Sequence, residues 1–337
     1  MRMLRYILRR ILFIVPVLLG SILIAFFLTR VVPGNPIEKV AGPYASNEKV
    51  EELKTEAGLN DPIIVQFVHY IGDLIQGDMG ISYQTNQPVT KDLWEKFPAS
   101  LELVLYAMIL AIALAIPLGV ISAVKRGTWV DHIARVLAVL GVSVPIFWIG
   151  LVLLSAFYVR FEILPGPEGR LPIGYPEPDR ITGLFTIDTL LHGDIDSFWK
   201  ATRALILPVL TIAIVAMAPI ARMTRAMMID ALDSDYIRTS RSMGLPTRVI
   251  VLHHAFKNAF IPVLTLIAAV FGFALGGEVL VELIFTWPGL GLYSYNAILG
   301  SDFPAVQGFI ILVTAVYILI YLAVDVTTAI LDPRVEL

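Results

Sequence analysis

The sequence contains no cysteine, which excludes disulfide bonds, thiolate metal sites and cysteine nucleophiles. It has no phosphate-binding loop of the form G-x-x-x-x-G-K-[ST], so it lacks the usual backbone cradle for ATP. The metalloprotease pattern H-E-x-x-H and the serine hydrolase pattern G-x-S-x-G are also missing. These absences argue against the common hydrolase classes, and they predict that any energy from ATP reaches this chain through another polypeptide.

An excess of charge of one sign is missing too. The 25 Lys and Arg residues and 28 Asp and Glu residues leave a net charge of −3, so no basic surplus indicates a nucleic-acid partner. The five histidines are scattered apart from His253 and His254. Neighbouring side chains on a helix point about 100° apart and make a poor chelate. We therefore expect neither a nucleic-acid partner nor a metal site.

Apolar residues are abundant instead, at 57% of the chain against roughly 45–50% in globular proteins. Six uncharged runs are each about long enough for a hydrocarbon core that needs roughly 20 helical residues: 11–29, 103–124, 136–159, 204–221, 258–277 and 303–324. We expect an all-α, multi-pass membrane protein with six transmembrane helices. Since neighbouring helices satisfy the freed carbonyls, prolines should kink these helices rather than break them, at Pro16, Pro117, Pro145, Pro208 and Pro219.

Arginines precede the first uncharged run. A signal peptide shares that polarity, but its apolar core is shorter, roughly 7–15 residues, and a small-x-small cleavage site should follow it. We expect instead an uncleaved first span that starts in the cytosol. Six spans then place segments 1–10, 125–135, 222–257 and 332–337 inside, where they carry fourteen Lys and Arg against six Asp and Glu. The positive-inside rule agrees with this topology, in which both termini are cytoplasmic.

The segment from residue 33 to 97 is polar and too long for a simple connector, so we expect it to fold on the outer face. The sequence thus divides into three parts. Residues 1–97 form the N-terminal transmembrane helix with its extracytoplasmic segment, and 98–331 form a five-helix core. Residues 332–337 form a short cytoplasmic tail.

A polar stretch from Asp235 to Pro262 separates two of the apolar runs. Ser234 or Asp233 can cap a helix, Gly244 can supply its left-handed ending, and Pro246 stands where a second helix can start. We expect a helix, a sharp turn and a second helix. The cations of this stretch assign it to the cytoplasmic face: Arg238, Arg241, Arg248 and Lys257.

Gly244, with Pro262 eighteen positions later, resembles the EAA loop of the permease subunits of type I ABC importers. The family places E-A-A where this chain has 238–240. The pattern R-T-A-R-A-x-G-L is similar to the dipeptide and oligopeptide branch, with Ser240 replacing an alanine. The resemblance implies that 229–257 is a cytoplasmic coupling loop whose coupling helix docks on an ATPase subunit. The implied contact residues are Asp235, Arg238, Thr239, Ser240, Arg241, Gly244, Leu245 and Arg248. The alternative is a loop that merely connects two membrane helices.

Further motifs resemble the same branch, and together they extend from Arg9 to Arg334. They are P-G-N-P at 33–36, G-L with D-P at 58–62, G-D-M-G-I-S at 77–82, K-R-G-T-W-V-D at 125–131, S-V-P-I-F at 143–147, W-P-G-L-G at 287–291, D-F-P-A-V-Q-G at 302–308 and D-P-R at 332–334. Asn35 departs from the usual aspartate.

The resemblance implies the permease subunit of an ATP-driven importer, located in the cell (inner) membrane and not itself an enzyme. It would form half of the translocation pathway for di- or oligopeptides. Its implied partners are a second homologous permease subunit, making a heterodimer, two cytoplasmic ATPase subunits and an extracytoplasmic solute-binding protein. The chain itself would bind no cofactor, because ATP and Mg are used by the ATPase subunits.

Glu278 and Glu282 lie one helical turn apart near the outer end of the fifth run. A carboxylate at hydrocarbon depth costs at least about 2.5–3.5 kcal/mol unless it is paired or hydrated. One interpretation is a wet cavity mouth or gate, formed with Trp287, Pro288 and Gly289. The other is that both carboxylates reach the outer surface or bond to a partner chain. The sequence does not decide between them.

Other functions stay open. Related permeases carry oligosaccharides, glutathione or nickel complexes, and the sequence does not choose among these solutes. An intramembrane enzyme could use the histidine pair or the glutamate pair. An ion-driven secondary transporter is a third class, although we find neither an inverted repeat nor a carboxylate near the middle of a span.

Overall fold

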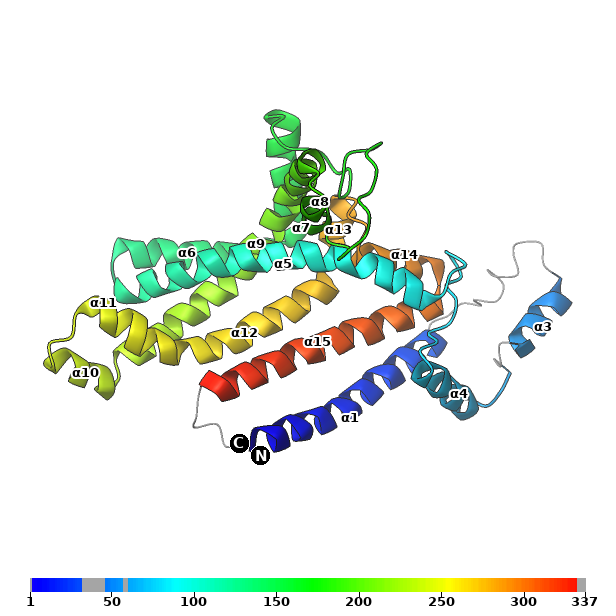
Figure 1. The fold of residues 1–337 in the computed structure, drawn as a ribbon, viewed down its shortest axis with the longest axis horizontal. Helices are drawn as coiled ribbons and strands as arrows, with labels where there is room; N and C mark the ends of the chain where they lie inside the picture. The colour runs from blue at the N-terminus through cyan, green and yellow to red at the C-terminus, as the bar shows by residue number, and fades with distance from the viewer. Residues whose placement is uncertain (1, 32–45, 57–59, 332–337) are drawn as a thin grey trace. The chain divides into compact units, whose positions relative to one another are not determined.

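The computed structural model describes residues 2–31, 46–56 and 60–331 (Figure 1). Within these residues the regular structure is helical, apart from one isolated β-bridge between Ile81 and Pro88, which confirms the predicted all-helical class. The predicted tail at 332–337 and residues 32–45 of the predicted outer segment lie outside the described residues. The chain divides into two compact units, Met1–Pro98 with Gly289–Ile318 and Ala99–Pro288 with Leu319–Leu337.

Helices from both ends of the chain build the first unit. They are α1 (Arg2–Val31), α3 (Asn47–Glu56), α4 (Ile63–Ile75), the first turns of α5 (Val89–Val124), α14 (Leu290–Gly300) and the first half of α15 (Phe303–Leu331). The Phe26 ring of α1 lies 5.2 Å from Phe67 and 5.5 Å from Tyr70 of α4, measured between centroids. Gln307 of α15 donates a 2.7 Å hydrogen bond to the Thr29 hydroxyl. Side chains of α4 and α15 therefore hold α1.

A buried carboxylate fixes the loop before α5 to the start of α15. Asp302 accepts hydrogen bonds from the Ser82 hydroxyl at 2.6 Å and from the Gln84 backbone N–H at 3.1 Å. Val89 and Leu290 meet in a small apolar core of the same unit. The 77–82 motif and the loop that follows it are thus held in this unit by their hydrogen bonds to Asp302.

The second unit surrounds α9. It contains the rest of α5, α6 (Trp129–Ser143), α7 (Ile146–Leu154), the π-helical η1 (Ser155–Arg160), α8 (Phe185–Leu191), α9 (Ile195–Leu232), α10 (Asp235–Ser242), α11 (Thr247–Val249), the π-helical η2 (Ile250–Ala255), α12 (Phe256–Gly277), α13 (Val279–Ile284) and the end of α15. Among the helices that pack on α9 are α6, α7, α8 and α12. Because α9 continues through Pro208 and Pro219, the expectation of unbroken helices is confirmed there.

A glycine lets α5 approach α9 closely. A Cβ atom at Gly119 would lie 2.6 Å from the Thr224 Cβ and 2.7 Å from the Ala221 carbonyl oxygen. Real Cβ atoms essentially never lie within 3.0 Å of another heavy atom, so a larger residue would push the two backbones apart. Close backbone approach at small residues is how helices associate in lipid, where no hydrophobic force drives them together.

Four helices of the described chain are long and apolar enough to cross a membrane: Val89–Val124, Ile195–Leu232, Thr247–Gly277 and Phe303–Ile330. A fifth crossing needs the pair Trp129–Gly141 and Ile146–Arg160, which bends by 99°. The expectation that Pro145 only kinks its helix is therefore wrong. Val144 and Pro145 are both extended, since a proline disfavours helical backbone at the residue before it. Within α1, the apolar stretch whose side chains the structure describes is Ile14–Thr29.

Candidate functional site

The predicted bend forms as two helices joined at Gly244. Its φ of +76° lies in the left-handed region, which confirms the predicted ending of α10. Leu245 N–H bonds to the Ser240 carbonyl and Gly244 N–H bonds to the Arg241 carbonyl, the two bonds of a Schellman ending. The turn therefore has a defined geometry that depends on a residue without a Cβ.

The start of α10 differs from the prediction in its capping. Ser234 occupies the N-cap position, but its hydroxyl donates to the Ala231 carbonyl instead of accepting from the new helix. Asp233 ends α9 and forms an exposed ion pair with Arg126 at 3.1 Å. Pro246 is the N-cap of α11, which begins at Thr247. The second helix therefore starts one residue after the proline, and not at the proline itself.

One buried side chain fixes α10 to the membrane helices. Ile237 is 0% exposed and packs in a core with Met228 of α9, Ala123 of α5 and Ile250 of η2. The partly buried Leu245, just after the turn, packs against the same core. Sequence reasoning missed Ile237, although it is the one aliphatic residue in the polar run 233–242. Through this core, α10 is coupled to α5, α9 and the start of the α11–η2–α12 helix.

The remaining predicted contact residues are mostly on the surface. Ser240 is half-buried, and the exposed set is Asp235, Arg238, Thr239, Arg241, Gly244 and Arg248. Arg238 and Asp235 form a 3.2 Å pair one turn apart on α10, exposed enough to contribute little stability. The segment thus combines an apolar anchor on one side with a charged face on the other, and α10 extends beyond the end of α9 in Figure 1.

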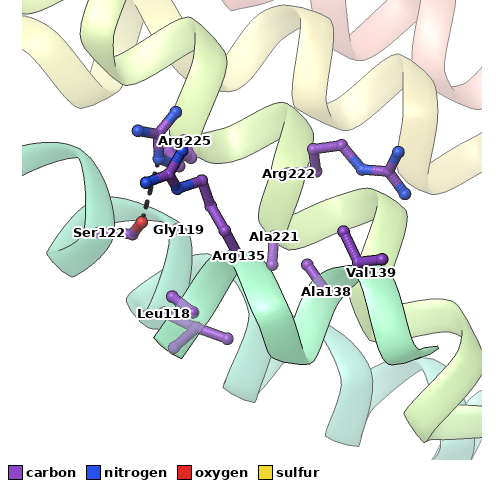
Figure 2. A pocket seen from close by; sticks show the side chains of 10 residues that line it. Leu118, Gly119, Ser122, Arg135, Ala138, Val139, Ala221, Arg222 and Arg225 are labelled. Carbon is purple, nitrogen blue, oxygen red and sulfur yellow. Dashed lines mark hydrogen bonds between the residues drawn. The ribbon is translucent and has the colours of Figure 1, made fainter. Parts of the chain in front are cut away.

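An ion pair between a buried aspartate and a half-buried arginine joins three helices next to this segment. Arg225 of α9 donates two hydrogen bonds to Asp131 of α6, at 2.7 and 2.9 Å, and the Ser122 hydroxyl of α5 donates a third at 2.7 Å. Figure 2 shows Arg225 beside Ser122. Gly127 N–H adds a fourth bond to Asp131 at 3.1 Å. The carboxylate is therefore fully used in holding α5, α6 and α9 together.

The predicted gate residues of the second unit lie beyond the other end of α12, a helix of 22 residues or about 33 Å. Glu282 and Trp287 are both buried, at 3% and 1% exposed. Glu282 accepts a hydrogen bond from the Ser100 hydroxyl at 2.5 Å, and Trp287 Nε1 donates to the Ala99 carbonyl at 2.8 Å. Both residues are thereby fastened to one turn of α5.

Glu278 occupies a different position. The α12 helix ends at Gly277, and Glu278 is the N-cap of the next helix, α13. Its carbonyl accepts a hydrogen bond from the Glu282 backbone N–H at 3.1 Å, so the two glutamates lie one helical turn apart, as predicted. Burial and the neighbouring Glu282 carboxylate raise the pKa of Glu278 to about 7. Of the other two predicted residues, Pro288 is half-buried and Gly289 begins α14 in the first unit.

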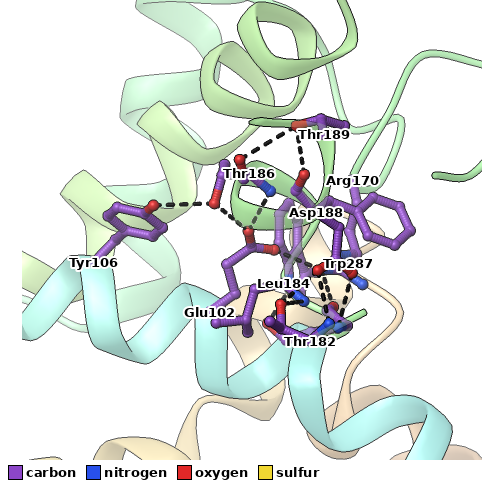
Figure 3. Close-up of polar contacts among 12 residues, drawn as sticks. Glu102, Tyr106, Arg170, Thr182, Leu184, Thr186, Asp188, Thr189 and Trp287 are labelled. Atoms are coloured by element: carbon purple, nitrogen blue, oxygen red, sulfur yellow. Dashed lines mark hydrogen bonds and ion pairs between the residues drawn. The ribbon is translucent and has the colours of Figure 1, made fainter. Parts of the chain in front are cut away.

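A buried network around Glu102 was not predicted (Figure 3). Glu102 of α5 accepts hydrogen bonds from Arg170 at 2.6 Å and from the Thr186 hydroxyl and backbone N–H at 2.6 and 2.9 Å. The Arg170 guanidinium stacks 3.5 Å above the Phe185 ring and donates to the Gly183 carbonyl. A carboxylate immediately before the uncharged run at 103 was the available signal, but its partner lies 68 residues away.

Asp188 organises the loop that precedes it. It accepts hydrogen bonds from the Thr182 hydroxyl at 2.6 Å and from the backbone N–H groups of Thr182 and Gly183 at 2.8 Å. Burial opposes ionisation, but these hydrogen bonds outweigh it and hold the pKa of Asp188 below its usual value. Burial also lowers the pKa of Arg170, against the attraction of Glu102. The segment between η1 and α9 is thus tied to α5 by paired, buried charges.

Comparison with known proteins assigns the family. Residues 115–337 match the family described as binding-protein-dependent transport system inner membrane component, and residues 3–104 match the family's N-terminal region. The chain belongs to this permease family. It is a non-catalytic, multi-pass component of an inner membrane, and a system of this kind also needs a binding protein and an ATPase.

Three curated permeases are similar over nearly their full length. The probable D,D-dipeptide transport system permease protein DdpB of Escherichia coli is 42% identical, over 96% of this chain and 94% of that protein. The dipeptide transport system permease protein DppB of Alkalihalophilus pseudofirmus is 40% identical, over 99% and 100%. The glutathione transport system permease protein GsiC of Escherichia coli is 34% identical, over 99% of both chains.

Proposed function

We propose that this permease forms half of the pathway through which an ATP-driven importer takes up dipeptides and short oligopeptides. The supporting observation is 40–42% identity to two dipeptide permeases along almost the whole of each chain. The direct test is uptake of a labelled dipeptide by proteoliposomes that contain the assembled transporter and its binding protein. Absence of ATP-dependent dipeptide uptake, with another solute transported normally, would refute the assignment of substrate.

Glutathione is a second candidate, because a glutathione permease is 34% identical over the same length. Glutathione shares the amide linkage and free carboxylates of a short peptide, so one pathway could accept both. Competition distinguishes the two. If the transporter imports dipeptides, unlabelled dipeptide should block uptake of the labelled one at far lower concentration than glutathione does.

The proposed assembly pairs this chain with a second homologous permease subunit and two cytoplasmic ATPase subunits, which bind ATP and Mg. The chain itself then holds no cofactor, and within the described residues no cluster of three His, Asp or Glu could bind a metal ion. The 229–257 segment would carry the coupling contact. Its charged surface would meet the ATPase subunit, and the Ile237 core would pass the movement to α9 and α12. This assembly predicts that the purified chain without ATPase subunits hydrolyses no ATP.

We further propose six spans, with α1 and the bent α6–α7 pair as the two that complete the set, and with both termini in the cytoplasm. Single cysteines test this cleanly because the chain has none of its own. A cysteine at Ser46 or at Ile173, which is 89% exposed, should react from outside, and one at exposed Ser242 should not. Gly169 is a poor labelling position, since its φ is +84° and an added Cβ would lie 3.3 Å from the Thr286 carbonyl oxygen. The reverse labelling pattern would contradict the orientation.

The functional division into 1–97, 98–331 and 332–337 stays part of this proposal, as does an outer gate made by Glu278, Glu282, Trp287, Pro288 and Gly289. Thr286 supports a gate there. It is β-branched with φ of +53°, a backbone conformation that costs roughly 1–3 kcal/mol, and residues strained in this way cluster at switch regions. The hydrogen bonds of Glu282 and Trp287 to α5 would hold the gate in one position. Crosslinking cysteines introduced at Ser100 and Glu282 should stop uptake; undiminished uptake in the crosslinked protein would exclude the gate.

A further inference from the structure

A cavity between α5, α6 and α9 has a lining that none of the proposed transport steps uses (Figure 2). Its volume is about 170 Å³. Most of its wall is apolar and comes from residues such as Leu118, Ala138 and Ala221. Three arginines complete the wall, Arg135 from α6 and Arg222 and Arg225 from α9, and no acidic residue lines it. The cavity is thus amphipathic, with positively charged side chains beside an apolar wall.

The charges of these arginines are only partly compensated. Arg225 is neutralised by its two hydrogen bonds to Asp131. Arg135 reaches the same carboxylate only at 3.8 Å, and its side chain is 49% exposed. Within the part of the chain that the structure describes, Arg222 forms no ion pair and is exposed. One carboxylate therefore serves Arg135 and Arg225 together, and about two positive charges remain for an external anion.

The hydropathy of the sequence places Arg135 and Arg222 at the edge of the membrane. Arg222 directly follows the uncharged run 204–221, and Arg135 directly precedes the run 136–159. The two runs belong to α9 and to the α6–α7 pair, and α6 packs on α9. Figure 2 shows Arg135 and Arg222 on these facing helices, near Ala138 and Ala221. The arginines thus lie at headgroup level, and the apolar wall extends toward the hydrocarbon.

We propose that this cavity binds an anionic glycerophospholipid. The phosphate would lie between Arg135 and Arg222, and one acyl chain would enter the apolar part beside Leu118 and Val139. Charge complementarity selects the headgroup, because basic pockets between membrane helices favour anionic lipids by about 1 kcal/mol for each Lys or Arg near the surface. The apolar wall selects a lipid over a free anion such as phosphate.

Lipid retention by the assembled transporter tests the proposal. The complex is placed in nanodiscs with equal amounts of phosphatidylglycerol and phosphatidylcholine, re-extracted, and its retained lipids are quantified by mass spectrometry. We expect phosphatidylglycerol to be retained over phosphatidylcholine. Arg135→Gln and Arg222→Gln should each lower that retention about fivefold, and together about 25-fold, at about 1 kcal/mol for each arginine. Arg222→Lys should keep most of it.

Arg160→Gln is the matched control, because Arg160 is an exposed arginine that flanks the other end of the 136–159 run and lines no part of this cavity. It should leave retention unchanged. Val139→Trp should narrow the cavity and lower retention without altering charge, which keeps the proposal testable if the double arginine variant does not assemble. Equal retention of both lipids, or equal retention by wild type and the arginine variants, would overturn the proposal and indicate that a partner subunit covers this face. Displacement of the lipid by inorganic phosphate alone would show a simple anion site and would also overturn it.

Discussion

Replacing Gly244 with valine tests whether the bend after α10 transmits energy. Gly244 has φ of +76°, and an added Cβ would meet no atom within 4 Å. The substitution therefore adds no steric clash with the rest of the protein. Its whole cost comes from the backbone conformation, since a side chain with a Cβ disfavours the left-handed region by roughly 1–2 kcal/mol.

That cost is small compared with the stability of a folded domain, but it is large enough to change the conformation of the turn. A domain is stable by about 5–15 kcal/mol, so the Gly244→Val protein should fold and insert. The same 1–2 kcal/mol lowers the ratio of the native turn to alternative endings by about 5- to 30-fold. Any alternative ending breaks the Leu245-to-Ser240 bond and gives α11 a new direction relative to α10. We therefore expect ATP-dependent uptake to fall by up to that factor, together with co-purification of the ATPase subunit.

Gly193 provides the matched control. It has φ of +74° and equally open surroundings, but it lies between α8 and α9, away from the bend. Gly193→Val should cost the same strain and leave uptake nearly normal. Gly244→Asn should keep much of the activity, because asparagine tolerates left-handed backbone better than most other residues that carry a Cβ. If Gly244→Val transports and binds the ATPase subunit as well as Gly193→Val does, the bend is a passive connector and the reasoning fails.

Three further predictions follow from buried groups of the second unit. Arg170→Met leaves the Glu102 carboxylate buried without its cation, which should cost about 3–5 kcal/mol and lower the melting temperature of the purified protein, whereas replacing both residues with apolar ones should recover most of that loss. Ile237→Ala removes a fully buried side chain and should cost about 2–5 kcal/mol, with uptake reduced more than by truncating the half-exposed Tyr236 to alanine. The pKa of Glu278 is raised to about 7, so the contribution of this group to stability is fully present below about pH 4.5 and is lost as pH rises through 7; a Glu278→Gln protein whose melting temperature falls as steeply as the wild type's between pH 5 and 8 would assign that decline to another group.

The 229–257 segment shows how much of the structure could be predicted from the sequence. Glycine alone among the residues favours positive φ without strain, so the position of Gly244 before a new helical pattern predicted the turn directly. Which residue anchors α10 was not predictable, because the core around Ile237 collects side chains from α5, α9 and η2 that are up to about 130 residues apart in the chain. The predicted cap by Ser234 was wrong, because its hydroxyl donates to the Ala231 carbonyl of the preceding helix and accepts no hydrogen bond from α10.

The long uncharged runs by themselves determined the class of this protein, because a bilayer requires such lengths and backbone groups in lipid must bond within helices. Motif order along the chain determined the family. Tertiary structure alone decided where Pro145 breaks a helix, and it alone paired Glu102 with Arg170 and Asp131 with Arg225. The residues of the first pair are 68 positions apart in the chain, and those of the second are 94 positions apart. Hydropathy depends on composition within a short window, whereas the partner of a buried charge depends on which helices meet, and no local pattern contains that information.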